Sequence, residues 1–199
     1  MKTLKINSFQ AGSKIILLLI LLTIFSCKDK NISAQKANSS STSTADVKPP
    51  QVDIHTAVVT DNLSALKQHI DAGTNINEKD PYGGSSPLIS AALFGKTEMA
   101  KLLIEAGADL NFQNNDGSTA LNTAAFFCRP EIVKLLLSKG ADKTIMNKYG
   151  ATPYQSVAGP YKDIKNVYEM MDKMLGPMGL KTDYVYIEKT RPEIAAMLK

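Results

Sequence analysis

The nine-residue stretch Gly84–Ala92 (GSSPLISAA) recurs as Gly117–Ala125 (GSTALNTAA) and again as Gly150–Ala158 (GATPYQSVA). The leading glycines of the three stretches are 33 residues apart, and Gly107 and Gly140 share that spacing. A fixed period of this length is typical of structural units that stack on one another. We therefore expect a repeat architecture.

The segments after these stretches recur as well. Met99–Asn111 (MAKLLIEAGADLN) is followed one period later by Ile132–Asp142 (IVKLLLSKGAD), and Ile54–Ala57 with Leu63–Gly73 supplies an earlier copy. Together these motifs resemble ankyrin repeats, whose signature is Gly-x-Thr-Pro-Leu-His-x-Ala-Ala. The resemblance covers residues 52–170. It implies an all-α ankyrin-repeat solenoid with three full repeats, a degenerate fourth and a C-terminal helical cap.

Elementary helix chemistry agrees with this resemblance. Leu102 and Leu103, and Leu135–Leu137 one period later, lie among polar residues at helical spacing, so each second helix carries an apolar stripe. Gly107 and Gly140 stand where such a helix ends with a positive φ. Because one helix pair is too small to bury its own apolar side, neighbouring pairs must stack into a continuous core.

Several positions depart from the signature. Asn122 replaces the histidine, so we expect that turn to lose the histidine's hydrogen bonds, and Cys128 stands where another copy has the glycine that joins the two helices. In the fourth unit, residues 161–175 are predicted to form a longer second helix. Residues 190–198 are predicted to form a short final helix.

The first residues are predicted to be a targeting signal. Three lysines precede the apolar run Ile15–Phe25, which is the pattern of a signal peptide. The run ends at Ile24-Phe25-Ser26-Cys27, which resembles the lipobox of bacterial lipoproteins. The resemblance implies that residues 1–26 are removed and that Cys27 is lipidated. The alternative is an ordinary cleaved signal peptide with an incidental cysteine.

The remaining boundaries follow from composition. Residues 27–51 lack apolar side chains that could offset the entropy of ordering, so we expect a disordered, flexible linker. Residues 52–175 are assigned to the repeats and residues 176–199 to the cap. A lipidated Cys27 would anchor the protein in the bacterial cell envelope, at the outer membrane. Either the periplasmic face or the cell surface is compatible with Lys28-Asp29-Lys30 after the cysteine.

Charge and chemistry exclude several function classes. Residues 52–199 hold 16 basic and 17 acidic residues, a net charge of −1, so the basic surface of a nucleic-acid binder is not expected. The sequence shows no catalytic motif and too few ligands for a metal, so we expect no enzyme activity, no metal and no cofactor. His55 and Cys128 are the one conceivable base and nucleophile, and two repeats separate them.

A protein partner is the expected ligand, and the resemblance to ankyrin repeats indicates where it binds. Partners of that family usually contact the turn tips and the two positions after the Ala-Ala pair. These positions give an apolar, mainly aromatic strip: Tyr82, Leu93, Phe94, Phe126, Phe127 and Tyr149. We expect a monomer that recognises an unidentified envelope protein.

Three alternatives remain open at this point. Some of the rings in the strip could pack between repeats, or the C-terminal segment could fold back over them. The groove could instead hold an apolar small ligand or peptide. An unrecognised enzyme would need titratable residues clustered in a cleft.

Overall fold

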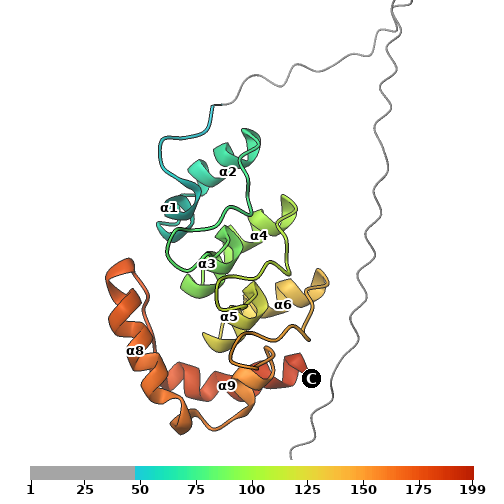
Figure 1. Ribbon diagram of the computed structural model, residues 1–199, viewed down its shortest axis with the longest axis vertical. Coiled ribbons are helices and arrows are strands. Elements are labelled where there is room, and N and C mark those ends of the chain that lie inside the picture. The colour runs from blue at the N-terminus through green and yellow to red at the C-terminus, as the bar shows by residue number, and fades with distance from the viewer. Residues whose placement is uncertain (1–47) are drawn as a thin grey trace, which may run out of the picture. The chain divides into compact units, whose positions relative to one another are not determined.

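The computed structural model describes residues 48–199, and these residues form helices joined by turns, without a strand. Eight of the helices lie in two rows (Figure 1). The inner row consists of α1 (Ile54–Val59), α3 (Pro87–Phe94), α5 (Ala120–Phe126) and α7 (Gln155–Ala158). The outer row consists of α2 (Leu63–Asp71), α4 (Thr97–Glu105), α6 (Pro130–Ser138) and α9 (Tyr184–Leu198). Each helix packs against its neighbour in the row and its partner in the other row, so the expected all-α stack is confirmed.

The inner helices begin where the sequence supplies caps. The Ser86 hydroxyl accepts a hydrogen bond from the Ile89 amide at 3.3 Å, and Pro87 follows at the first helical position, where a missing N–H costs least. At α5, the Thr119 hydroxyl and the Asn122 side chain each accept from the other residue's backbone amide. The Asn122 amide group also donates to the carbonyls of Ile145 and Ala151 in the next turn. The expectation that this turn loses its side-chain hydrogen bonds is therefore wrong, because asparagine restores them.

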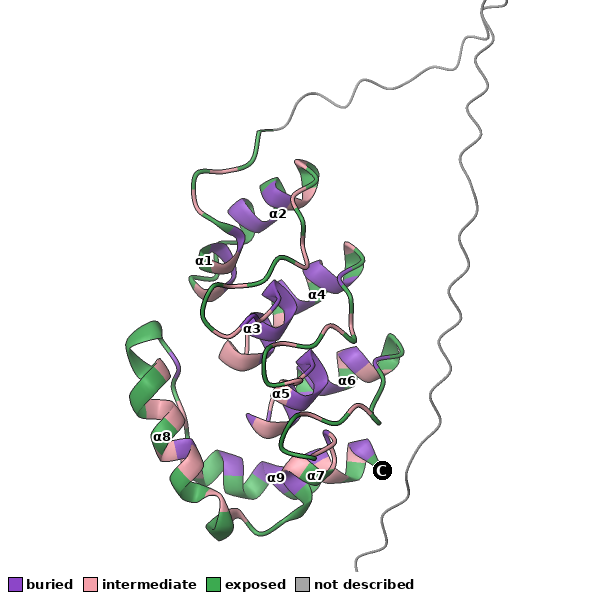
Figure 2. Cartoon of the chain, in the orientation of Figure 1, coloured by how far each residue is buried: buried purple, intermediate pink, exposed green. Residues whose placement is uncertain are grey.

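The core lies between the two rows. Leu88 and Leu121 from the inner row and Leu103 and Leu136 from the outer row are fully buried, and they belong to one cluster that runs through the whole stack. Figure 2 shows that the facing sides of successive helices are buried while their outward sides are exposed. Burial of each leucine requires the neighbouring repeat, as expected for stacked units.

The turns bind to one another along the stack. The Asn115 amide donates to the Gly83 carbonyl at 2.9 Å, and one period later the Lys148 amide donates to the Asp116 carbonyl at 2.8 Å. The Asn111 side chain accepts from the Asp142 amide at 2.9 Å in the same way. The Asn115–Gly83 and Lys148–Asp116 bonds join the same pair of turn positions one period apart, and such bonds set the register between adjacent repeats.

The links between paired helices need a left-handed residue. Gly95 joins α3 to α4 with φ +67°, and Cys128 joins α5 to α6 with φ +52°. Cys128 thus occupies the glycine position, as predicted, although a side chain in this conformation costs free energy. The predicted positive φ of Gly107 and Gly140 is also confirmed, at +87° and +85°.

The C-terminal third differs from the predicted order of helices. After α7 the chain forms a short turn of helix η1 (Tyr161–Asp163), then α8 (Lys165–Leu175), then η2 (Gly176–Met178). The helix that pairs with α7 and stacks on α6 is α9, so the assignment of residues 161–175 as the second helix of the fourth unit is wrong. The final helix is also longer than predicted and contains Pro192. The boundaries at residues 175 and 176 stay a prediction.

The proposed leader, Cys27 and most of the linker lie outside the described residues. Among residues 48–199, no helix combines the length and the apolar character that crossing a membrane requires.

Two adjacent leucines of α6 give a direct test of neighbour-dependent burial. Leu136 is fully buried between the rows, whereas Leu137 is only half-buried. We expect Leu136→Ala to lower the free energy of unfolding by about 3 kcal/mol and Leu137→Ala by about 1 kcal/mol, because the larger cavity and the larger lost burial belong to Leu136. Urea unfolding measures both. Equal losses would contradict the packing described above.

Candidate interaction surface

Two of the predicted partner-binding residues are widely exposed at turn tips. The exposed fractions of Tyr82 and Tyr149 are 86% and 77%. The turns that present them are fixed: the Asp80 carboxylate accepts from the Tyr82 amide at 2.8 Å, and the Asn147 side chain accepts from the Tyr149 amide at 3.0 Å. The aromatic rings therefore project into water from rigid supports.

The other four residues lie at the carboxyl ends of inner helices. Leu93 and Phe94 end α3 and are half-buried, and Phe126 ends α5 and is half-buried too. Phe127 follows directly and is only 5% exposed. Phe127 therefore belongs to the core, which corrects its expected place on an open surface.

The cover over Phe126 and Phe127 is Tyr168 of α8. The Tyr168 ring stacks on Phe126 with 4.6 Å between ring centroids, and it meets Phe127 edge-on at 6.3 Å. Its hydroxyl donates a hydrogen bond of 2.5 Å to the Phe126 carbonyl. The continuous aromatic strip predicted from the sequence is thus interrupted, because the C-terminal segment folds back over α5, one of the alternatives left open above.

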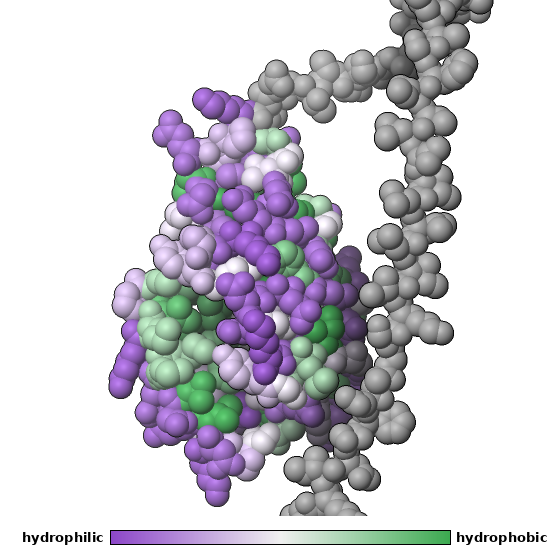
Figure 3. Space-filling model, in the orientation of Figure 1, coloured by the Kyte–Doolittle hydropathy of each residue, from purple (hydrophilic) through white to green (hydrophobic). Residues whose placement is uncertain are grey.

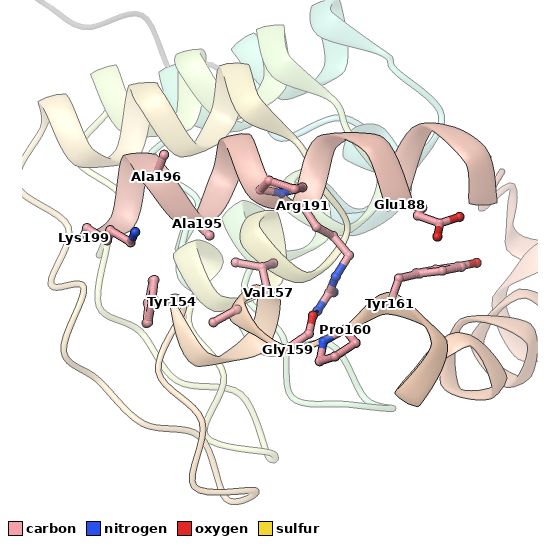
Figure 4. A pocket seen from close by; sticks show the side chains of 12 residues that line it. Tyr154, Val157, Gly159, Pro160, Tyr161, Glu188, Arg191, Ala195, Ala196 and Lys199 are labelled. Atoms are coloured by element: carbon pink, nitrogen blue, oxygen red, sulfur yellow. The ribbon is translucent and has the colours of Figure 1, made fainter.

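Arg191 of α9 holds Tyr168 in place. The Arg191 guanidinium donates through Nη1 to the Tyr168 hydroxyl and through Nη2 to the Gly159 carbonyl, both at 3.1 Å. The side chain is 3% exposed, and Figure 4 shows it reaching from α9 to the Gly159–Pro160 segment. Burial raises the pKa of the Tyr168 phenol, and the positive charge of Arg191 partly opposes this shift. Tyr168 is therefore a neutral donor at physiological pH.

Sequence reasoning missed both Tyr168 and Arg191. The available signal was the spacing of Ile164, Tyr168, Met171 and Leu175, which places four apolar residues on one side of a helix. The sequence predicts residues 161–175 as the second helix of the fourth unit, whereas in the structure this segment returns across the inner row.

A shallow pocket of about 390 Å³ lies between α7, α9 and the segment that joins α7 to α8 (Figure 4). Tyr154, Val157, Pro160 and Ala195 form apolar walls, with Arg191 and Lys199 among the charged residues that line it. None of the six predicted partner-binding residues lines this pocket. It therefore gives no support to a small ligand held in the aromatic strip.

The apolar surface lies mainly over α8. Met170 and Met174 of α8 and Met178 of η2 are exposed. Leu93 and Phe94 at the end of α3 are half-exposed. Figure 3 shows apolar atoms gathered over α8, whereas the turns beside them are hydrophilic.

The structure keeps the candidate base and nucleophile apart. His55 belongs to α1, Cys128 follows α5, and α3 packs between these two inner helices. The Cys128 thiol is fully buried, with its sulfur 3.7 Å from the Ile187 carbonyl. Burial raises the pKa of this thiol to about 11, although Arg191 and Arg129 lower it in part. No three His, Cys, Asp or Glu side chains of residues 48–199 form a group that could hold a metal ion.

Comparison with known proteins agrees with the geometry. Residues 54–147 match the family model described as ankyrin repeats, in three copies. The human DNA-binding protein RFXANK is 39% identical over 56 residues, which are 28% of this chain and 22% of that protein. The Arabidopsis thaliana E3 ubiquitin-protein ligase KEG is 33% identical over 64 residues, 32% of this chain and 4% of that protein.

The crystal structure of the ankyrin repeat domain of Bcl-3, a member of the IkappaB protein family, superposes with a TM-score of 0.50 and 32% identity. The superposition covers 52% of this chain and 45% of that one, so the chain spans less than half the length of each relative. Residues 54–147 thus match the ankyrin-repeat model, and the described part of the chain has the fold of an ankyrin-repeat domain. Domains of this class generally mediate protein–protein interaction and are typically non-catalytic.

The buried thiol makes stability fall in alkali. Above about pH 9 the unfolded chain loses the Cys128 proton, whereas the folded chain keeps it until about pH 11, so a rise in pH favours unfolding. We expect the free energy of unfolding to fall by about 2 kcal/mol more in the wild type than in Cys128→Ala between pH 8 and 10.5. Urea titrations across that range measure the difference. Parallel curves for the two proteins would show that folding does not raise the pKa of this thiol.

Proposed function

We propose that this chain is a non-catalytic protein-recognition module held at a bacterial envelope membrane through lipidated Cys27. Its partner would contact the turn tips at Tyr82 and Tyr149 and the half-exposed Leu93 and Phe94. The observation that carries the proposal is the exposure of the two tyrosine rings on fixed turns. Exposed aromatic side chains on a rigid support are the usual anchors of protein interfaces.

The rest of the surface supports a protein ligand as well. The turns form a long, hydrophilic face with an apolar side at α8, which matches the mixed character of protein interfaces (Figure 3). Neither of the two tyrosines lines the pocket beside Arg191. Because Phe126 and Phe127 are covered by Tyr168, they are left out of the proposed contact surface.

Removal of the two tyrosine rings tests the recognition surface. In cells that produce the full chain, chemical cross-linking followed by mass spectrometry identifies what is attached to the wild type. We expect Tyr82→Ala with Tyr149→Ala to reduce capture of that polypeptide about tenfold or more, because two exposed anchors are lost. The matched control is Tyr186→Ala, which removes an exposed tyrosine from α9. Equal capture by the double variant and the control would place the contact elsewhere.

The membrane anchor is tested by the two cysteines. The chain contains only Cys27 and Cys128, so a fatty-acid label has two possible sulfur sites. We expect Cys27→Ser to abolish metabolic labelling with an alkyne fatty acid and to move the protein from the membrane fraction to the soluble fraction, since acyl chains provide the anchoring free energy. Cys128→Ser should keep both the label and the membrane location. Labelling of Cys27→Ser, or an unlabelled wild type, would reject the anchor.

A further inference from the structure

Three equivalent residues form an apolar edge along the inner row. Val59, Leu93 and Phe126 each precede by two positions the left-handed residue that ends their helix: Asp61, Gly95 and Cys128. All three side chains are half-buried. Their regular spacing gives one apolar contact per repeat, and we call this set the ledge.

Helix α8 already occupies the ledge at one position. Tyr168 stacks on Phe126 and donates to the Phe126 carbonyl. Ile164, Met171 and Leu175, at positions −4, +3 and +7 from Tyr168, pack against the core on the same side of α8. The ledge therefore accepts an amphipathic helix, because one is seated there.

The spacing of a helix matches that of the ledge. Residues seven apart on a helix are separated by about 10.5 Å, and packed helices are about 8–10 Å apart, so positions i and i+7 can meet adjacent repeats. In Figure 1, α8 runs beside the inner row along the direction of stacking. A helix in this orientation can place one apolar residue on each member of the ledge.

α8 buries few of its side chains for its length. Tyr168 is its one buried residue, whereas α9 buries five. Both connections of α8 contain glycine and proline, at Gly159–Pro160 and at Gly176–Gly179. Release of α8 would cost the Tyr168 contacts, the half-buried apolar stripe and the hydrogen bond that the Tyr184 hydroxyl of α9 donates to the Asp172 carboxylate at 3.0 Å.

We propose that the ledge is a binding site for amphipathic helices, that α8 fills it in cis at Phe126, and that the partner inserts a helix carrying a tyrosine in place of α8. This inference rests on the proposed function in one respect: the helix that replaces α8 is taken to belong to another protein. Tyrosine is specified because the Phe126 carbonyl and the Arg191 guanidinium both use the Tyr168 hydroxyl. A ring without a hydroxyl would leave a buried guanidinium with one partner fewer, which is costly.

A peptide supplied in trans tests the site without knowledge of the partner. The probe is a fluorescent synthetic peptide with the sequence of residues 161–179, and its anisotropy is measured with the full chain in a mild detergent. The chain variants are Tyr168→Ala, which removes the cis anchor, and Met171→Asp with Leu175→Asp, which lifts α8 while leaving the stack unchanged. A peptide with Tyr168→Ala is the matched control probe.

We expect both chain variants to bind the peptide at least tenfold more tightly than the wild type, and the control peptide to bind neither. Adding Phe126→Ala to either variant should remove the binding. Circular dichroism checks that each variant is folded. If Tyr168→Ala is unfolded, the test relies on Met171→Asp with Leu175→Asp, with the same expected results. Folded variants that fail to bind, or a wild type that binds equally well, would overturn the proposal.

Two further outcomes distinguish this proposal from a dimer of the chain and from the proposed function. If the variants dimerise without peptide in sedimentation experiments, the occupant is a second copy of the chain, and the partner-helix proposal is overturned. If the peptide fails while capture through Tyr82 and Tyr149 persists in cells, the ledge is rejected and protein recognition at the turn tips stands.

Discussion

No helix pair in this chain can remove its apolar side from water without a neighbour. Leu103 and Leu136 are fully buried only because the adjacent repeats cover them, and the cluster they belong to runs from α1 to α9. Backbone hydrogen bonds between turns, such as Asn115 to Gly83, keep successive units in register. This dependence explains why the last repeat must be completed by some helix. The chain meets that need with α9, which closes the outer row beside α6.

Because α9 fills the outer position of the last repeat, α8 is not needed there and packs elsewhere on the stack. It lies across the end of α5, where Tyr168 joins Phe126, Arg191 and, through Arg191, the Gly159 carbonyl. These contacts cover Phe126 and Phe127. Leu93, the next residue of the ledge, stays half-exposed. In the proposal above, Tyr168 therefore controls whether the ledge at Phe126 is open to another molecule. The exposed rings of Tyr82 and Tyr149 belong to the other contact surface that we propose.

The repeats could be predicted from the sequence because their signals are local and periodic. Glycines at fixed spacing, prolines at helix starts and leucine stripes act within one repeat, so Gly107, Pro87 and Leu103 take the predicted roles. The path of α8 could not be predicted in this way. Its stripe of Ile164, Tyr168, Met171 and Leu175 specifies an amphipathic helix but not the surface that it covers. That choice depends on Arg191, which is distant in sequence and had no recognisable motif. Asn122 shows the opposite case, since its substitution for histidine was read as a loss although a capping box compensates for it.

The relation between α8 and the stack is tested most directly by native-state hydrogen exchange, resolved along the chain by mass spectrometry. If α8 is a separately held occupant of the ledge, its amides exchange through an opening that costs about 2 kcal/mol less than the opening of α5 and α9. The amides of α5, α6 and α9 should exchange together, because each of these helices depends on its neighbour for burial. Protection of α8 equal to that of α5, lost in the same step, would contradict this description and make α8 an integral part of the stack.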